Sequence, residues 1–404
     1  MDQPFRSQFP SLQRKLNDHP LIFLDGPAGT QVPDKVINAM SDYYRTSNAN
    51  THGQFLTTRE TDEVMDSTRR LAADFLGAEG PHTISFGQNM TSLNYALSRA
   101  IGRFLQPGDE ILITQLDHEA NRGPWLALRE RGILVNEIRL KHDGTLNYED
   151  LASKLSGRTR LVALGWASNL CGTINDIYKV RDLTHRAGAW MLVDAVHFAP
   201  HFTIDVQAAG CDFLLCSAYK FYGPHVGILY SRPGLLDRLP TDRLRTAAQA
   251  APYSIETGTL NHAAIAGVKA AIEFIAEQGA GETPRQRLVS AMEKIGEHER
   301  KMVEKLYKGL EKLEPVKIYG PDIRPGKRAP TISFTVEGKR PEEVCRFLGE
   351  RGIFAWDGHF YAIRAVEVLG LLEKGGVTRM GISAYTTEQE IDAVLKAVKA
   401  LIKA

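Results

Sequence analysis

The sequence lacks most of the features that mark secreted and membrane proteins. Only four of its 404 residues are cysteines, and none of them forms a CxxC pair or the spacing of a disulfide framework. No apolar run approaches the length needed to span a bilayer, and the first residues lack the apolar core of a secretory signal. We therefore expect a cytoplasmic protein whose cysteines stay reduced, and the sequence indicates no metal site.

No sign of charge dominates the sequence either. Its 49 basic and 48 acidic residues give a net charge of +1, so the chain lacks the basic field that recruits nucleic acid or an anionic membrane. With 43% hydrophobic and 24% charged residues, the composition is that of a globular protein. A length of 404 residues predicts two domains.

The middle of the chain alternates short β-branched runs with helix-like stretches. The strand candidates are His82–Phe86, Glu110–Gln115, Leu134–Leu140, Leu161–Gly165, Trp190–Val193, Asp212–Cys216 and Gly227–Tyr230. The helix candidates between them are Met90–Phe104, Pro124–Arg131, Tyr148–Leu155 and Val180–Ala187. This alternation predicts an α/β fold with a mostly parallel central sheet flanked by helices.

After about Gly279 the pattern changes to a mixture of helices and strands without the regular alternation. A charged helical stretch at 283–313 leads into several strand-like runs, and the last eighteen residues or so read as an amphipathic helix. We expect a large domain at 21–279 and a smaller C-terminal α+β domain at 280–404. Residues 1–20 are expected to form an N-terminal segment that packs with the small domain.

Two charged residues stand at the ends of successive apolar runs. Lys220 follows the run 212–219, and burial there would lower its pKa and leave the nucleophilic amine that a Schiff-base enzyme needs. Asp194 ends the run 190–193, where a carboxylate could hold a proton on a pyridine nitrogen and make the ring an electron sink. Together they point to pyridoxal phosphate. The alternative is a buried Lys–Asp ion pair, or two strand-end charges that face solvent.

A helix start after the first of these strands is a candidate phosphate site. Asn89, Met90 and Thr91 follow a strand end and Gly87, and free N–H groups at a helix start favour an anion. An ordinary N-cap explains the same pattern. Ser217, three residues before Lys220, has a hydroxyl that could reach the same phosphate.

Four further residues suit a planar cofactor and an amino acid. His118 follows a strand and could stack on a ring, while His197 and Asn169 could bond the phenolic oxygen of the cofactor. Arg379 lies in a late strand, and its guanidinium suits the carboxylate of an amino acid. A surface salt bridge is the alternative for Arg379, and a solvent-facing loop position is the alternative for His118.

With these residues assembled, the chain resembles the class V aminotransferase family of fold type I pyridoxal-phosphate enzymes, and its cysteine desulfurase branch in particular. The resemblance covers nearly the whole chain, from Phe23 to the C-terminal helix. The stretches that carry it are 193–197, 217–224, 168–173, 117–118 and 256–259.

The resemblance implies a role for each matching residue. By position, Lys220 would form the internal aldimine, Asp194 would pair with the pyridinium nitrogen, and His118 would stack on the ring. Thr259 would reach the phosphate of the neighbouring subunit's cofactor, which implies a homodimer with shared active sites. The other implied cofactor contacts are His197, Asn169, Ser217, Asn89, Met90 and Thr91. The implied substrate contacts are Arg379, Ala28, Tyr361 and His359.

One departure from the desulfurase pattern bears directly on the reaction. Tyr361 stands where the mobile nucleophilic cysteine would be, and no cysteine falls in the loop 354–362. A phenol with a pKa of about 10 cannot accept sulfane sulfur, so we expect no persulfide chemistry. His197 replaces the usual glutamine and Tyr219 the usual histidine before the lysine, and both changes resemble kynureninase.

The resemblance therefore implies an enzyme that acts on an α-amino acid through an external aldimine and Cα deprotonation, with Lys220 as the general base. We expect an aminotransferase or a β-eliminating C–S lyase. A kynureninase-like hydrolase and an amino-acid epimerase remain as enzyme alternatives. A regulatory protein that binds pyridoxal phosphate without turnover is the alternative from another class.

Overall fold

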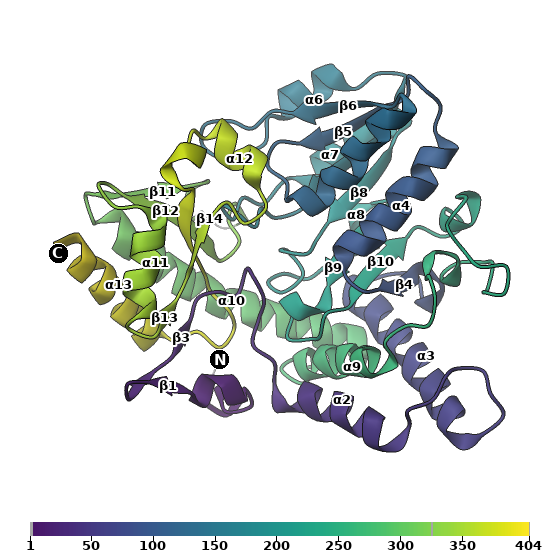
Figure 1. The fold of residues 1–404 in the computed structure, drawn as a ribbon, viewed down its shortest axis with the longest axis horizontal. Coiled ribbons are helices and arrows are strands. Elements are labelled where there is room, and N and C mark those ends of the chain that lie inside the picture. Colours follow the sequence, from purple (N-terminus) through teal and green to yellow (C-terminus); the bar gives the residue numbers. More distant parts are fainter. Residues whose placement is uncertain (1–2, 325, 404) are drawn as a thin grey trace.

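The computed structural model describes residues 3–324 and 326–403, and these form two domains side by side (Figure 1). Within them, the larger domain is built on a seven-stranded sheet and the smaller one on a four-stranded sheet. In sheet order the seven strands are β4 (Ile84–Gly87), β10 (Gly227–Ser231), β9 (Phe213–Ser217), β8 (Trp190–Asp194), β7 (Thr159–Gly165), β5 (Glu110–Thr114) and β6 (Leu134–Ile138).

Strand β10 is the exception to the parallel arrangement that the alternating pattern predicts. It runs antiparallel to both of its neighbours, β4 and β9, while β9, β8, β7, β5 and β6 pair in parallel. Only residues 218–226 connect β9 to β10, and so short a connection cannot hold the crossover that a parallel pair needs. The expected mostly parallel sheet is therefore confirmed, with this one reversal.

Helices cover both faces of the sheet, which explains why its central strands β5, β7, β8 and β9 are mostly apolar. Neighbouring residues of one strand point to opposite faces, so Leu192 joins one core cluster while Met191 and Val193 join the other. Helix α4 (Met90–Phe104) packs in the first cluster, and helices α3 (Leu56–Leu76), α7 (Ile177–Arg186) and α9 (His262–Ala276) pack in the second. In these central strands the polar residues stand at the ends, while the edge strand β6 carries Asn136 and Glu137 in its interior.

The smaller domain has the α+β character that the sequence predicts. Its antiparallel sheet contains, in order, β11 (Val316–Tyr319), β12 (Thr331–Val336), β15 (Val377–Gly381) and β14 (Trp356–Gly358). The helices that cover it are α10 (Pro284–Glu311), α11 (Pro341–Gly349) and α13 (Glu388–Lys403). Figure 1 shows α10 running from beneath the large domain into the small one, so this helix joins the two.

The N-terminal segment contacts both domains. Arg6 of α1 (Gln3–Arg6) forms an ion pair with Glu390 at 2.8 Å in the small domain, while the Phe5 ring lies 5.4 Å from the Phe274 ring in α9. Further on, β3 (Ile22–Phe23) pairs in parallel with β13 (Ile353–Phe354). Residues 22–23, which the sequence groups with the large domain, thus pair with a strand of the small one.

The remaining elements include several that the sequence analysis did not predict. Those not predicted are β1 (Lys15–Leu16), β2 (His19–Pro20), α2 (Asp34–Thr46), α8 (Val206–Ala209) and α12 (Ile363–Val368). The predicted ones are α5 (Gly123–Leu126) and α6 (Tyr148–Lys154). The helix predicted at 124–131 divides into α5 and a 3₁₀ helix at Ala127–Arg131. Among the described residues, no helix is long and apolar enough to cross a membrane, and no three His, Cys, Asp or Glu residues are grouped to hold a metal ion.

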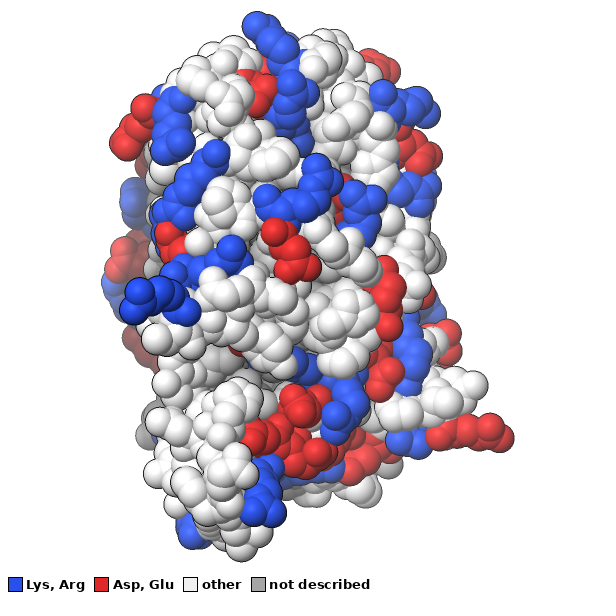
Figure 2. Space-filling view, turned by 90° about the vertical axis from the view of Figure 1, so that its right-hand side faces the viewer, with Lys and Arg blue, Asp and Glu red and all other residues white. Residues whose placement is uncertain are grey.

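The surface carries both signs of charge. On the face that lies at the right of Figure 1, Lys and Arg side chains are interspersed with Asp and Glu (Figure 2). This arrangement agrees with the balanced composition of the chain, which has 49 basic and 48 acidic residues.

Candidate active site

A cavity of about 700 Å³ lies at the carboxyl ends of the parallel strands, bordered by the small domain. Ligands of such sheets bind at this edge, and the volume is within the usual range for a cofactor with its substrate. It brings together predicted residues that are far apart in the sequence. They are Ala28, Asn89, Met90, Thr91, His118, Asn169, Asp194, His197, Ser217, Lys220, Tyr361 and Arg379.

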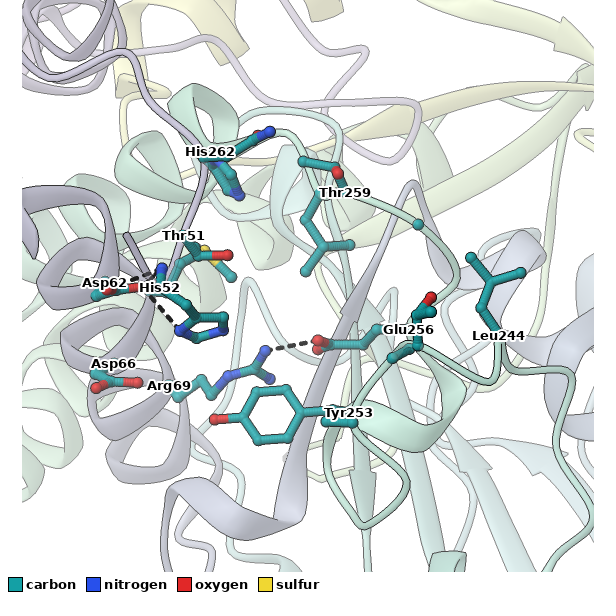
Figure 3. Close-up of a pocket in the computed structure, with 17 residues that line it drawn as sticks. Thr51, His52, Asp62, Asp66, Arg69, Leu244, Tyr253, Glu256, Thr259 and His262 are labelled. Carbon is teal, nitrogen blue, oxygen red and sulfur yellow. Dashed lines mark hydrogen bonds and ion pairs between the residues drawn. The ribbon is translucent and has the colours of Figure 1, made fainter. Parts of the chain in front are cut away.

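Two predicted site residues lie outside this cavity. The ring nitrogen Nδ1 of His359 accepts a hydrogen bond from the Tyr361 N–H at 3.1 Å, so His359 supports the turn rather than lining the cavity. Thr259 lines two other cavities of about 720 and 620 Å³. Figure 3 shows it in the first of these, above the ion pair between Arg69 and Glu256.

Lys220 is held in the short 3₁₀ helix Ala218–Lys220, directly after β9. Only 8% of the residue is exposed, and its Nζ donates to the backbone oxygens of Pro27 and, at 3.0 Å, Ala28. Burial, helped by the Arg379 charge, lowers the pKa of the Lys220 amine to about 7. No ion pair joins Lys220 to Asp194 among the described residues, so the Lys–Asp pair is not formed.

Asp194 is the last residue of β8 and is equally buried. Its Oδ1 accepts a hydrogen bond from the Val196 N–H at 2.9 Å, which fixes the carboxyl group at the edge of the sheet. Burial raises its pKa to about 6. A carboxylate in such surroundings gains most from a cationic partner, and a protonated pyridine nitrogen is one.

His118 follows β5 and is held neutral. The Ala120 N–H donates to its Nδ1 at 2.9 Å, so in the neutral ring the proton sits on Nε2. Burial and the charges of Lys220 and Arg379 lower the His118 pKa to about 4. A neutral, fixed imidazole suits the predicted stacking on a planar ring.

The start of helix α4 offers an anion site in the same cavity as the lysine. Asn89 is its N-cap, with Oδ1 accepting from the Ser92 N–H at 2.8 Å, so the ordinary N-cap of the alternative is present as well. The Met90 N–H donates to Ser217 Oγ at 2.9 Å, which leaves the hydroxyl proton of Ser217 able to donate in turn. The helix dipole and this hydroxyl together favour a phosphate.

Asn169 and His197 are tied to the small domain. The Asn169 side chain donates to the Phe360 carbonyl at 2.8 Å, and His197 Nε2 lies 2.9 Å from Thr331 Oγ1 of β12. Burial lowers the His197 pKa well below its usual value, so the ring is neutral. An amide has two N–H groups and an oxygen, so Asn169 keeps bonding capacity for the predicted cofactor contact.

Arg379 is buried rather than paired at the surface. It is 3% exposed, its Nη1 donates to the Asn169 carbonyl at 2.9 Å, and its guanidinium lies 3.9 Å from the centre of the Phe360 ring. Burial lowers its pKa to about 9, opposed by the charge of Asp25. No carboxylate of the described residues forms an ion pair with it, which leaves the guanidinium available for a substrate carboxylate.

The structure adds residues that the sequence analysis did not single out. Asp117 is 4% exposed, accepts from the Gly165 N–H at 2.8 Å, and has a pKa raised by burial to about 7. Asp25, whose pKa burial raises to about 6, is the carboxylate that acts electrostatically on Arg379. His225 stacks on Tyr219, with ring centres 4.5 Å apart. Asp117 lies within the matching stretch 117–118 and His225 directly follows the stretch 217–224, but neither had been given a role.

This set of residues fits pyridoxal phosphate. A buried amine of lowered pKa, a buried carboxylate, a neutral imidazole and an anion-binding helix start line one cavity. These are the groups that would hold the aldehyde, the ring nitrogen, the ring face and the phosphate, respectively.

The lowered pKa of Lys220 leads to a prediction about cofactor capture. Only the neutral amine attacks an aldehyde, and the neutral fraction grows as pH rises through about 7. The rate at which apoprotein captures pyridoxal phosphate should therefore rise about tenfold per pH unit below that value and level off above it. Stopped-flow absorbance measures this rate. A rate that levels off only near pH 10, as for an ordinary lysine, would contradict the burial argument.

Comparison with known proteins agrees with this geometry. The family model for aminotransferase class-V matches residues 22–394. A cysteine desulfurase of Serratia proteamaculans is 31% identical over 98% of this chain and 97% of its own. A probable cysteine desulfurase of Halalkalibacterium halodurans is 32% identical, over 97% and 95%.

The solved structures give the same result. The apo structure of a cysteine desulfurase from Thermococcus onnurineus has a TM-score of 0.89 at 26% identity, covering 100% of this chain and 98% of that one. A cysteine desulfurase of Escherichia coli has a TM-score of 0.86 at 26% identity, covering 99% and 98%. The predicted α/β fold of type I is therefore confirmed, and the chain belongs to the aminotransferase class-V family of pyridoxal-phosphate enzymes.

Proposed function

We propose that this enzyme acts on an α-amino acid as an aminotransferase or a β-eliminating C–S lyase, without forming a persulfide. The observation that carries the proposal is a buried amine and a buried guanidinium in one cavity, Lys220 for the cofactor and Arg379 for the substrate carboxylate. When bound, pyridoxal phosphate supplies the electron sink that allows a bond at Cα to break.

The protonation state of each side chain suits it to a different role. Lys220 would hold the cofactor, and its amine, with a pKa of about 7, is suited to take a proton from the substrate Cα. Asp194 would hold the proton on the ring nitrogen of the cofactor, while Ser217 and the start of α4 would bind its phosphate. His118 bears its proton on Nε2 and keeps the ring face in place.

The positions of the cysteines support the absence of persulfide chemistry. None of the described residues that line the cavity is a cysteine, and Cys171, Cys211 and Cys216 are at most 1% exposed. Burial raises the pKa of the Cys345 thiol to about 12, so it is not a thiolate at neutral pH. At the cavity mouth stands Tyr361, 67% exposed.

A panel of amino acids tests the proposal. The holoprotein is incubated with each one, with and without an α-keto acid acceptor, and keto acid, ammonia, sulfide and alanine are measured. Keto acid that needs an acceptor identifies transamination, and ammonia without one identifies elimination. Alanine released from a larger substrate would favour the hydrolase alternative, to which His197 and Tyr219 in the cavity correspond. Cysteine that loads sulfur onto the protein would overturn the proposal.

Removing the carboxylate anchor should weaken substrate binding. Arg379→Met is expected to raise KM by about 30-fold or more, because truncating one partner of a buried charge pair costs about 2 kcal/mol or more. The Arg379 charge also lowers the Lys220 pKa, so cofactor capture by this variant should shift to higher pH. Arg379→Lys keeps the charge and serves as the control: its KM should rise while the pH profile stays. An unchanged KM in both variants would place the carboxylate elsewhere.

We also propose a homodimer with shared active sites, in the cytoplasm. The four cysteines are unpaired, as in a reducing compartment, and Thr259 lies in cavities outside its own chain's site (Figure 3). Thr259→Ala should weaken cofactor binding about tenfold by loss of a charge-assisted hydrogen bond. Thr246→Ala, in the same cavity, is the matched control. Light scattering that finds one chain per particle, or no effect of Thr259→Ala, would contradict the shared site.

A further inference from the structure

We propose that residues 356–361, here called the aromatic loop, select α-amino acids with an uncharged aromatic side chain. The inference rests on the proposed function, and it names the substrate class of that same cavity. Trp356, Phe360 and Tyr361 of this loop line the cavity, and Trp356 and Tyr361 are 50% and 67% exposed there. Exposed rings at the mouth of a cavity are surfaces that a substrate ring can cover.

A second aromatic surface lines the same cavity. Tyr219, next to the cofactor lysine, stacks on His225 with ring centres 4.5 Å apart and an interplanar angle of 10°. The Lys220 amine lies 4.8 Å from the centre of the Tyr219 ring. Aromatic rings therefore stand both in the loop and beside the lysine.

The aromatic loop is fixed in place before any substrate binds. Phe360 and Tyr361 both have left-handed backbone, with φ of 50° and 59°, which residues other than glycine rarely adopt. Hydrogen bonds hold this conformation: Asn169 Nδ2 donates to the Phe360 carbonyl at 2.8 Å, and the Glu119 N–H donates to the Tyr361 carbonyl at 2.7 Å. A surface ordered in advance loses less conformational entropy on binding.

The loop is also placed between the two anchors of an amino acid. The Phe360 ring stacks on the Arg379 guanidinium at 3.9 Å, next to the expected position of the substrate carboxylate. The Tyr361 ring lies 5.3 Å from that of His118, on the cofactor side. An amino acid held by its carboxylate at Arg379 and by its nitrogen near Lys220 can therefore extend its side chain along the loop.

The cavity offers little to pair with a charged substrate side chain. Apart from histidines, the lining residues with acidic or basic side chains are Asp117, Asp194, Lys220 and Arg379. All four are buried, and the last three have roles toward the cofactor and the carboxylate. Asp357 belongs to the aromatic loop but does not line the cavity. Among the described lining residues, no further charged side chain is left to pair with an acidic or basic substrate, while a small side chain would leave the rings in water.

Substrate competition tests the inference. The kcat/KM of the holoprotein is measured for phenylalanine, tyrosine, tryptophan, leucine, alanine and cysteine, together with the change that each causes in the cofactor absorption band. The best aromatic amino acid should exceed alanine by about 100-fold or more, a ratio in the range that pocket contacts supply. Trp356→Ala and Tyr361→Ala should each reduce this ratio by about tenfold. Tyr178→Ala, an exposed tyrosine on α7, should leave the ratio unchanged.

The outcomes separate this inference from the function on which it rests. Alanine or cysteine turned over as well as the aromatic amino acids would overturn the inference and leave the proposed function standing. So would variants that lower kcat/KM for every amino acid by the same factor, because the loop would then be only structural. If no amino acid is turned over or alters the absorption band, the proposed function falls and the inference falls with it.

Discussion

Replacing Lys220 by alanine is expected to abolish turnover and to leave the cofactor removable by dialysis. The variant loses both the amine that holds the cofactor and the base that takes the Cα proton, and the base alone is worth about 10²- to 10⁴-fold. In the folded chain this amine bonds only the backbone oxygens of Pro27 and Ala28 among the described residues. The fold should therefore survive its removal. Absorbance after dialysis and the far-ultraviolet circular dichroism spectrum measure the two effects.

A matched control distinguishes the effect of losing Lys220 from the general effect of losing a lysine. Lys141→Ala removes an exposed lysine outside the cavity and should keep both colour and turnover. Lys220→Ala protein that still binds cofactor irreversibly under borohydride would show that another amine forms the link. In that case the role assigned to position 220 is wrong.

Replacing Asp194 by asparagine should reduce turnover by on the order of 100-fold or more while leaving the apoprotein as stable as before, or slightly more stable. Asparagine keeps an oxygen for the Val196 N–H, so no buried donor is left unpaired. The substitution removes the negative charge. Burial destabilises that charge and thereby raises the pKa of Asp194 to about 6. The lost charge no longer stabilises a proton on the cofactor nitrogen.

Denaturant unfolding of the apoprotein, alongside steady-state kinetics, separates the two roles of Asp194. The difference in unfolding free energy between wild type and the Asp194→Asn variant should change with pH in one direction. Because the folded pKa of Asp194 lies above its unfolded value, the wild-type penalty is absent at low pH and grows as pH rises through the range from about 4 to about 6. Asp143→Asn, at an exposed turn, is the control. A variant that unfolds but keeps its turnover when folded would assign Asp194 a purely structural role.

The central sheet could be predicted because its strands are buried on both faces and read as continuous apolar runs. Elements that bury polar residues were not predicted. Helix α3 buries Thr61 and Thr68, whose hydroxyls donate to carbonyls one turn earlier, so its inner face did not look apolar. Strands β3 and β13 contain two residues each, too few for an alternating pattern.

Site residues that end a strand could be predicted from the sequence. The contacts that distant segments make with them could not. Lys220 and Asp194 could be placed together because carboxyl ends of neighbouring parallel strands meet at one edge. The carbonyls that hold Lys220 come from residues 193 and 192 positions earlier. Likewise, nothing in the letters Phe360 and Tyr361 signals left-handed backbone, because tertiary contacts impose it.

Peptide mapping after borohydride reduction tests the account most directly. Purified protein is mixed with pyridoxal phosphate, reduced, digested and analysed by mass spectrometry for the lysine that carries the phosphopyridoxyl group. We predict a single modified site, Lys220, with about one group per chain, and none when Lys220 is replaced by alanine. Label on a different lysine, or a colourless protein that takes up no cofactor at all, would contradict the account.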